Sequence, residues 1–584
     1  MGDRAWRWLK FGALACALPG LGGCAIHHYR VGGRGTADAP PPRAAAQPAD
    51  MPSFAYAPLT PMALSEHIQI LASDAYEGRS PASAGEARTL DYIARAFTAA
   101  GLEPGATLPD GRRGWLQNVP IAISRFSAPP ELNVRLADGE AVLRDGDNIL
   151  IWSERAEPEL NLNRAELVFA GYGISAPERG WDDYEGVDVS GRVVMILAND
   201  PDFTAGENLG FQGRALSPAG TIRAKLDEAA RRGAAGILLI HETGAAGFGW
   251  DSARADYNGT HVSLLGEDGG TRGPLFEGWI NAQSAEALLA RAGPDLAVLR
   301  GLAQTRGFRA MPLNAAFSAT LPRERETRMT HNVIGVLPGR SHARDAVIYG
   351  AHWSGLGGAQ DQCAPINGDA ICNGALDNAS GIAGLIELAR RFSHEPRTER
   401  SVAFVAFAGE ERNQLGSVYY VDHPAFPLAR TAAMIDVHML STAGPSRDIV
   451  SLGPGGDLQT MLAEAAQSQG RSVSAERNPV RGAYYFADAF SFARTGAPSL
   501  STRAGLDLYA GGEERGLALR QVYMSQRHHR PGDEYDSSWD LTGALRDLLL
   551  LHDVGRRVAE SAQWPNWDAN SEYRALRDAQ ARRR

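Results

Sequence analysis

The sequence has few cysteines, and this limits the kinds of site that it can form. Of four cysteines in 584 residues, Cys16 and Cys24 lie close to the N-terminus, which leaves Cys363 and Cys372, nine residues apart. No second cysteine pair exists to complete a four-cysteine zinc tetrahedron. In an oxidising compartment the remaining pair therefore favours a disulfide over a metal site.

The chain also lacks a cluster of lysine and arginine interleaved with aromatic residues, and its formal net charge is −10. Nucleic-acid binding therefore has no electrostatic basis here. No fixed-period repeat is visible, which argues against a solenoid. With 44% hydrophobic and 22% charged residues the composition is that of a globular protein, and the length suits two to four domains.

No apolar stretch at the N-terminus is long enough for a stable membrane span. Arg4, Arg7 and Lys10 precede a short apolar segment interrupted by glycine and proline, which predicts a signal peptide over residues 1–23. The segment Leu21-Gly22-Gly23-Cys24 resembles the lipobox of bacterial lipoproteins, in which the cysteine carries lipid and starts the mature chain. The alternative is an ordinary secretory signal with an incidental cysteine. We expect a protein of the bacterial cell envelope, anchored to a membrane through lipid on Cys24.

Five further segments follow the signal peptide. Residues 24–61 are rich in Ala, Pro and Gly and predict a flexible tether. Residues 62–125 begin with two helical patterns around a Gly/Ser/Pro turn, and 126–315 contain short strand-like runs with one clear helix, which indicates a separate β-rich module. Residues 316–565 form the main domain, and 566–584 a basic, solvated tail.

The main domain alternates apolar runs with amphipathic helices. The helical pattern IAGLIELARRF is preceded by the runs NVIGVLPG and DAVIYGAH and followed by the runs RSVAFVAF and TAAMIDVHML. This order predicts an α/β fold with a mostly parallel central sheet flanked by helices. In such sheets ligands bind beyond the carboxyl ends of the strands.

Acidic and metal-competent residues stand at these strand ends. They are His352, Asp377, Glu410 with Glu411, His438, and the adjacent pair His528 and His529. Any one of them alone would more often be a satisfied polar group or a helix cap. Several carboxylates gathered in one cleft need a compensating cation, and mixed histidine and carboxylate ligands suit zinc or a similar divalent ion.

Glu410 and Glu411 follow directly on the apolar strand VAFVAF. Gly409 before them lets the chain bend, so both carboxylates can approach one place. The alternative is that they are first-turn residues of the next helix, where the helix dipole favours acidic side chains.

Six segments in order carry a resemblance to a known family: LASDAYEGRS, NVIGVLPG, YGAHWSGLG, NGALDNASG, VAFAGEERNQLGS and HHRPGDEYD. Together they resemble the di-zinc aminopeptidases, a family that also contains glutamate carboxypeptidase and the transferrin receptor. The likeness runs from about Met62 to Trp539, and segment 126–315 resembles the protease-associated domain inserted in many members. The fold implied is of the zinc-exopeptidase, phosphorylase/hydrolase-like type.

The resemblance also implies roles for individual residues. It makes His352 a ligand of one zinc ion, Asp377 the bridge between two, and Glu411 and His529 ligands of the second. It makes Glu410 the general base. The implied cofactor is Zn²⁺, two ions per chain, and the implied partners are peptide substrates, with no nucleic acid.

Several positions depart from the family's pattern. Ser354 stands where an aspartate normally orients the histidine ligand, and Gly355 follows where histidine is common. His438 occupies a position usually held by an aspartate ligand, and we expect it to bind metal with Asp436 behind it. In YYFADAFSF, Asp488 is retained but Ala489 replaces a histidine. The expected function is a membrane-tethered zinc aminopeptidase; the alternatives are a weakened or inactive member that acts as a binding protein, and a glutaminyl cyclase.

Overall fold

The computed structural model describes residues 59–584 except 206–207, 258, 267–268, 271–272 and 359–361. The predicted signal peptide, Cys24 and almost all of the tether lie outside the described residues. Within the described part of the chain, no helix is long and apolar enough to cross a membrane.

A mostly parallel sheet forms the main domain, as the sequence predicts. Its strands lie in the order β15 (Met311–Leu337), β19 (Arg400–Phe407), β16 (His342–His352), β20 (Thr431–Asp436) and β23 (Ser499–Ala504). The last four run parallel to one another, and β15 is antiparallel to β19. Beyond β23 the sheet continues with β21 (Asp448–Leu452), antiparallel to β23, and β22 (Ser472–Ala475).

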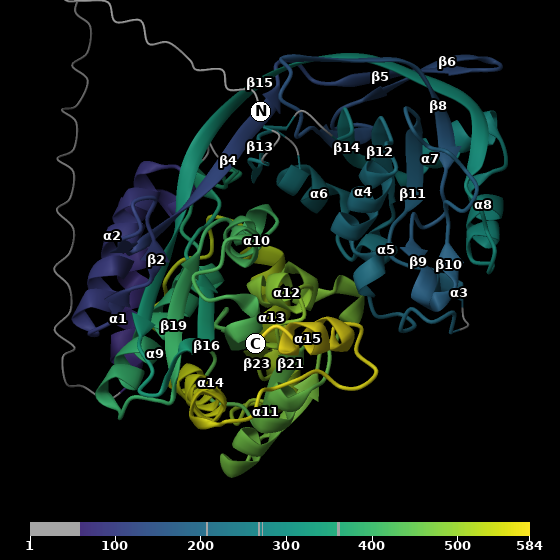
Figure 1. The fold of residues 1–584 in the computed structure, drawn as a ribbon. Helices are drawn as coiled ribbons and strands as arrows, with labels where there is room; N and C mark the ends of the chain where they lie inside the picture. Colours follow the sequence, from purple (N-terminus) through teal and green to yellow (C-terminus); the bar gives the residue numbers. More distant parts are fainter. Residues whose placement is uncertain (1–58, 206–207, 258, 267–268, 271–272, 359–361) are drawn as a thin grey trace, which may run out of the picture. The chain divides into compact units, whose positions relative to one another are not determined.

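Helices cover both faces of this sheet, which explains the continuous apolar runs of its strands. On β19, Phe404 and Ala406 belong to one core and Val405 and Phe407 to another. The first core includes residues of α1 (Pro61–Leu71), α2 (Ala84–Ala99), α9 (Ser380–His394) and α14 (Thr542–Glu560). The second includes residues of α10 (Leu415–Asp422) and α12 (Asp488–Ala493). Figure 1 shows α1 and α2 on one side of β19 and β16, with α10 and α12 on the other.

The β-rich module predicted over residues 126–315 has hydrophobic cores of its own. Their fully buried members all lie between Leu132 and Leu321. The strands are β5 (Glu131–Leu136), β6 (Gly139–Arg144), β7 (Ile149–Trp152), β8 (Glu159–Phe169), β11 (Val193–Leu197), β12 (Gly236–His241) and β14 (Phe276–Asn281). Of these, β8, β11, β12 and β14 are parallel neighbours.

This module contains more helix than its strand-rich sequence suggests. Besides α4 (Ile222–Arg231), which the sequence predicts, α7 (Ala282–Ala292) and α8 (Leu296–Ala303) pack on its sheet. Asn281 and Asp295 cap these two helices by accepting hydrogen bonds from the backbone N–H groups of Ser284 and Val298. These caps are the sequence signal for two helices that the pattern of apolar runs alone does not reveal.

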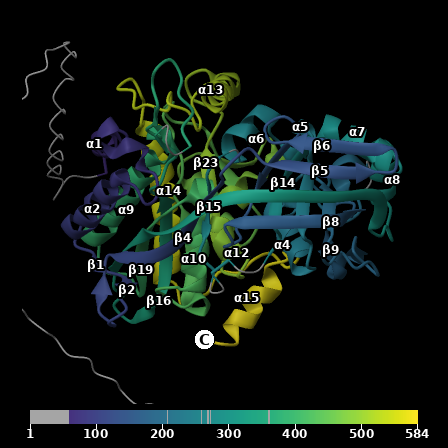
Figure 2. The same ribbon diagram turned by 90° about the horizontal axis from the view of Figure 1, so that it is seen from above.

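Strand β15 is 27 residues long and crosses the boundary expected near residue 315. Its first part pairs with β8 and β5, and its last part pairs with β4 (Leu116–Phe126), β1 (Glu103–Pro104) and β19. Figure 2 shows β15 beside both β8 and β4. The module and the main domain therefore share a continuous strand, and no loop separates them at residue 315.

Some α-helices and β-strands have not been named so far. They are β2 (Ala106–Thr107), β3 (Arg113–Gly114), β9 (Ser175–Ala176), β10 (Trp181–Asp182), α3 (Asp202–Ala205), α5 (Thr243–Ala246), α6 (Trp250–Tyr257), β13 (His261–Leu264), β17 (Gly357–Gly358), β18 (Ile371–Cys372), α11 (Asp457–Ser468), α13 (Gly512–Gln526) and α15 (Arg574–Ala581).

Cys363 and Cys372 form the expected disulfide, with their Cα atoms 5.5 Å apart. Both cysteines are buried against Leu356 in a small apolar cluster. The bond closes the segment between β16, which ends in His352, and the loop that carries Asp377. It therefore shortens the free chain between two of the predicted metal ligands.

Candidate metal centre

The predicted site residues meet at one edge of the sheet because the strands that carry them are parallel. His352 is the last residue of β16. Glu410 and Glu411 follow β19, and His438 follows β20 by two residues. Asp377 lies in the turn before α9, and His528 and His529 follow α13.

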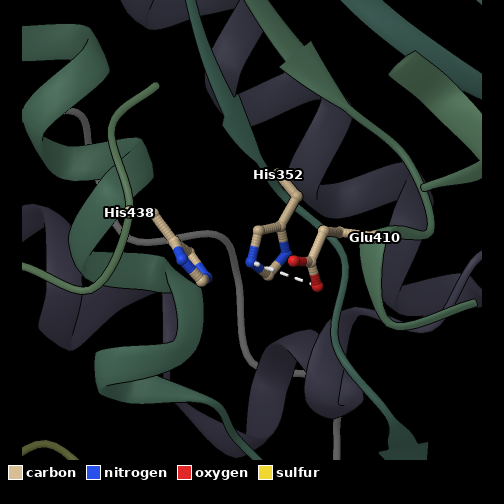
Figure 3. Close-up of side chains that lie close together, drawn as sticks. All are labelled: His352, Glu410 and His438. Carbon is tan, nitrogen blue, oxygen red and sulfur yellow. Dashed lines mark ion pairs between the residues drawn. The ribbon is translucent and has the colours of Figure 1, made fainter. Parts of the chain in front are cut away.

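Gly409 turns the chain where β19 ends. Its φ of +63° is in the left-handed region, where glycine has no steric cost, and a short 3-10 helix, Glu410–Arg412, follows. This turn directs the two adjacent carboxylates to different nitrogens of one ring. Glu411 Oε1 lies 3.4 Å from His352 Nδ1, whereas Glu410 Oε2 lies 4.0 Å from His352 Nε2. Figure 3 shows the Glu410 carboxylate beside the His352 ring, with His438 facing the same space.

Asp377 lies at the centre of the site, and its side chain is only 4% exposed. Its Oδ1 is 3.0 Å from His438 Nε2 and 3.3 Å from His352 Nε2. Its Oδ2 is 3.2 Å from His528 Nε2 and 3.5 Å from His529 Nε2. Each carboxylate oxygen therefore faces two imidazole nitrogens.

These donors fall into two groups that suit metal ions. One comprises His352, Glu410 and His438, and the other Asp377, His528 and His529; within each group the donor atoms lie within 4.8 Å of one another. Imidazole and carboxylate without thiolate is a donor set for zinc and related divalent ions. The residues present therefore fit the cofactor that the sequence indicates.

The two adjacent glutamates differ in electrostatics. Burial raises the pKa of Glu410 well above its ordinary value. Burial acts in the same direction on Glu411, but the neighbouring His352 outweighs it and lowers the pKa of Glu411 to about 2. Two neighbouring carboxylates with pKa values pushed apart are typical of sites that use one for proton transfer and the other as a fixed charge.

The pKa values of Asp377 and His438 are both lowered in the site. Although burial alone would raise it, the four neighbouring histidines hold the pKa of Asp377 well below its ordinary value. Burial, aided by the positive charge of Arg503, lowers the pKa of His438 to about 3. A neutral imidazole and an ionised carboxylate are the forms that bind metal.

Two residues that were not among the predicted site residues hold the site's loops. The guanidinium of Arg79, which is 1% exposed, donates to four backbone carbonyls, those of Leu71, Trp353, Asn373 and Gly374. Asp533 accepts hydrogen bonds from the backbone N–H groups of Leu376 and Asp377. Both lie inside motifs quoted above, LASDAYEGRS and HHRPGDEYD, but nothing in the sequence shows that their partners are backbone groups.

Ser354 takes part in the site, as expected, but as a hydroxyl donor. Its Oγ donates to Glu411 Oε2 over 2.7 Å and accepts from the backbone N–H of Gly409 over 2.8 Å. It thereby links the end of β16 to the end of β19. The acceptor beside His352 Nδ1 is Glu411, where the family pattern places an aspartate at position 354.

Asp436 does not stand behind His438 as expected. Its Oδ2 accepts a hydrogen bond from Ser501 Oγ over 2.9 Å, and His438 Nδ1 has no hydrogen-bond partner among the described residues. Asp436 is the last residue of β20 and points toward β23, whereas the chain has already turned at His438. Asp488 is buried at the start of α12, where burial raises its pKa to about 7.

A cavity of about 570 Å³ opens onto the site. Its lining includes the polar residues Asp377, Glu410, His438, Arg503, His528 and His529. Apolar side chains, among them Leu508, Leu519 and Phe486, complete the wall. The aromatic residues of segment 484–490 lie partly in the cavity wall and partly in the core. Phe486 lines the cavity and is 44% exposed, whereas Tyr484 is 4% exposed and belongs to the core.

Fold and site together define a class of protein: an α/β domain with a histidine and carboxylate cluster at the carboxyl ends of its parallel strands. Residues 332–552 match the model of Peptidase family M28. This part of the chain is therefore similar to a metallopeptidase family, in agreement with the resemblance seen in the sequence over these residues. The protease-associated identity of the middle module stays a prediction.

The individual relatives share 25–30% sequence identity with parts of this chain. The chain is 25% identical over 378 residues to "Probable glutamate carboxypeptidase AMP1" of Arabidopsis thaliana, covering 59% of this chain and 46% of that protein. It is 30% identical over 216 residues to a "Probable zinc metalloprotease" of Pyrenophora tritici-repentis, covering 35% and 47%. The chain thus spans about half the length of these relatives. Among solved structures, an aminopeptidase from Aneurinibacillus sp. strain AM-1 aligns over 86% of this chain and 95% of its own, with 21% identity and a TM-score of 0.48.

Proposed function

We propose that this protein is a zinc-dependent exopeptidase, and specifically an aminopeptidase that removes N-terminal residues from peptides. The observation that carries the proposal is the buried carboxylate of Asp377, shared between two groups of metal-competent donors beside an open cavity. The name of a Bacillus subtilis relative, "Aminopeptidase YwaD", supports the direction of cleavage.

His352, Asp377, His438 and His529 would hold the metal, and Glu411 is the further ligand that the family resemblance predicts. Zinc at such a site supplies a Lewis acid that polarises a carbonyl group and lowers the pKa of water. A pair of zinc ions is the stoichiometry that the two donor groups support.

Glu410 is the general base of the proposed reaction. Both glutamates line the cavity, but the side chain of Glu410 is 12% exposed, whereas that of Glu411 is 2% exposed and hydrogen-bonded to Ser354. A carboxylate with a raised pKa accepts a proton from the attacking water and returns it to the leaving amine. Glu411, with its pKa near 2, stays ionised and serves as a fixed charge.

The proposed protein is tethered to a membrane of the bacterial envelope through lipid on Cys24, with the catalytic body in the periplasm or another extracytoplasmic space. The charged start, apolar core and LGGC support this in sequence. Replacing Cys24 by Ser should move the protein from the membrane fraction to the soluble fraction. Unchanged membrane association would reject the lipid anchor.

The peptidase proposal is tested by measuring zinc per chain together with hydrolysis of a panel of aminoacyl-anilides. Glu410→Gln should keep its metal content and lose turnover by about 100-fold or more, since general acid–base catalysis contributes about 10²–10⁴-fold. Wild-type protein that binds zinc but hydrolyses no member of the panel would favour the binding-protein alternative. The binding-protein alternative is tested because the chain departs from the family pattern at three positions, Ser354, His438 and Ala489.

A further inference from the structure

The histidines around Asp377 are arranged in pairs. His352 and His438 approach Oδ1 at 3.3 and 3.0 Å, and His528 and His529 approach Oδ2 at 3.2 and 3.5 Å. In all four it is the Nε2 atom that faces the carboxylate. The family resemblance assigns a metal to only one of the last two, His529, so His528 is the additional member of this set.

The backbone at the second pair is bent so that adjacent side chains reach the same atom. His529 has a φ of +59°, a left-handed conformation that few residues other than glycine adopt. The two rings stack, with centroids 4.0 Å apart and an angle of 15° between their planes. Sparsely populated conformations of this kind persist where surrounding contacts require them, and they gather at functional sites.

The ring of His528 contacts Tyr523 edge-on and remains partly exposed to the cavity. Its side chain is 25% exposed and that of His529 is 31% exposed, and both line the cavity. The donor groups found around the site place His528 with Asp377 and His529 and leave Glu411 out.

We propose that His528 is a metal ligand, so that the two oxygens of Asp377 connect two metal positions that are each completed by a pair of imidazoles. One position has His352 and His438, and the other has His528 and His529. This inference rests on the proposed metal centre and goes beyond it by changing the ligand set of the second position.

The proposal gives Glu411 a positioning role. Ser354 Oγ holds its carboxylate 3.4 Å from His352 Nδ1, the nitrogen opposite the one that faces Asp377. A carboxylate on the remote nitrogen of a histidine ligand orients the ring and raises its basicity. Glu411 thus does for His352 what the absent aspartate at position 354 does in the family pattern, and His528 fills the place that Glu411 leaves at the second metal.

The ligand set also restricts the metal. Four imidazoles around one shared carboxylate form a softer and less negative ligand set than one rich in carboxylates. Such a set favours Zn²⁺, Co²⁺, Ni²⁺ or Cu²⁺ over Mg²⁺ and Ca²⁺, which prefer oxygen ligands.

The test is a competition titration of the full chain with Zn²⁺ against a chromophoric chelator, with metal content measured by elemental analysis. The variants are His528→Ala, His529→Ala and Glu411→Gln, and the matched control is His423→Ala, an exposed histidine that stacks on Tyr419 away from the cluster. Loss of a ligand should lower the affinity for one of the two zinc ions by at least about 100-fold. Loss of an orienting partner should lower zinc affinity by about 10–100-fold.

We expect His528→Ala and His529→Ala to retain one tightly bound zinc ion, Glu411→Gln to retain two with reduced affinity, and the control to match the wild type. His528→Ala that keeps two ions at unchanged affinity would overturn the proposal, as would loss of an ion from Glu411→Gln but not from His528→Ala. Circular dichroism of the metal-free variants checks that each is folded. The readout is metal, so a wild type that binds two ions but cleaves no peptide would refute the proposed function while leaving the ligand set standing.

Discussion

Arg79 is the residue whose loss should disturb the site most from outside the cavity. Its guanidinium makes four hydrogen bonds of 2.6–2.9 Å to backbone carbonyls: Leu71, Trp353, Asn373 and Gly374. Trp353 follows His352 directly, and Gly374 precedes Asp377 by three residues. Arg79→Ala therefore releases the two segments that present His352 and the bridging carboxylate.

The size of the effect follows from two opposing contributions. A hydrogen bond to a charged group contributes roughly 1.5–3 kcal/mol, so four contribute roughly 6–12 kcal/mol if they are independent. Against this, burying the guanidinium costs desolvation free energy, which lowers the pKa of Arg79 to about 10, and the variant avoids that cost. Removing one partner from a buried charged network typically costs about 3–5 kcal/mol, and we expect a value in that range.

The assay is denaturant unfolding of metal-free protein, combined with zinc titration of the folded variant. Arg577→Ala is the matched control, because Arg577 is also 1% exposed and also donates to backbone carbonyls, those of Thr431 and Ala432 at the opposite end of β20. Both variants should be destabilised, but only Arg79→Ala should also weaken zinc binding. Arg79→Lys keeps the charge with fewer donors and should fall between wild type and Arg79→Ala.

A loss of less than about 1 kcal/mol of unfolding free energy in Arg79→Ala, the net worth of one ordinary hydrogen bond, would refute this role for Arg79. The role would equally fail if Arg577→Ala weakened zinc binding as much as Arg79→Ala. In that case global destabilisation, and no local displacement of the ligand segments, would explain the loss of metal.

Three other perturbations test contacts described above. Reducing the disulfide between Cys363 and Cys372 should cost about 3 kcal/mol of stability by the loop-entropy model, measured by unfolding with and without reductant, and a change below about 0.5 kcal/mol would contradict it. Asp533→Asn should weaken zinc binding about 10–100-fold in the same competition titration, because one of the oxygens that orders the Asp377 segment becomes an amide; unchanged affinity would argue that this segment is held without it. Burial lowers the pKa of His552 to about 4, so the folded state binds its proton more weakly than the unfolded state. Stability should therefore fall as the pH drops from about 6.5 toward 4, by up to about 3 kcal/mol, and His552→Gln should flatten that part of the curve; an unaltered curve would assign the pH dependence to other groups.

Sequence alone determined the order of the main elements and most of the site. Apolar runs such as VAFVAF must be buried on both faces, which requires a parallel sheet between helices, and parallel strands bring their carboxyl ends to one edge. The order of the strands in the chain is therefore enough to place His352, Glu410 and His438 near one another. The presence of one remaining cysteine pair in a chain expected in an oxidising compartment was enough to predict the disulfide, which the structure contains.

Only the tertiary structure decided which way each side chain points beyond the strand ends. Past Gly409 and past β20 the backbone leaves the strand's alternation, and its direction depends on contacts with segments distant in sequence. That is why Glu411 accepts a hydrogen bond from Ser354. It is also why Asp436 accepts a hydrogen bond from Ser501, whereas the sequence predicted that Asp436 would support His438. Hydrogen bonds from a side chain to distant backbone groups, such as those of Arg79, leave no pattern in the sequence, because every residue presents the same carbonyl.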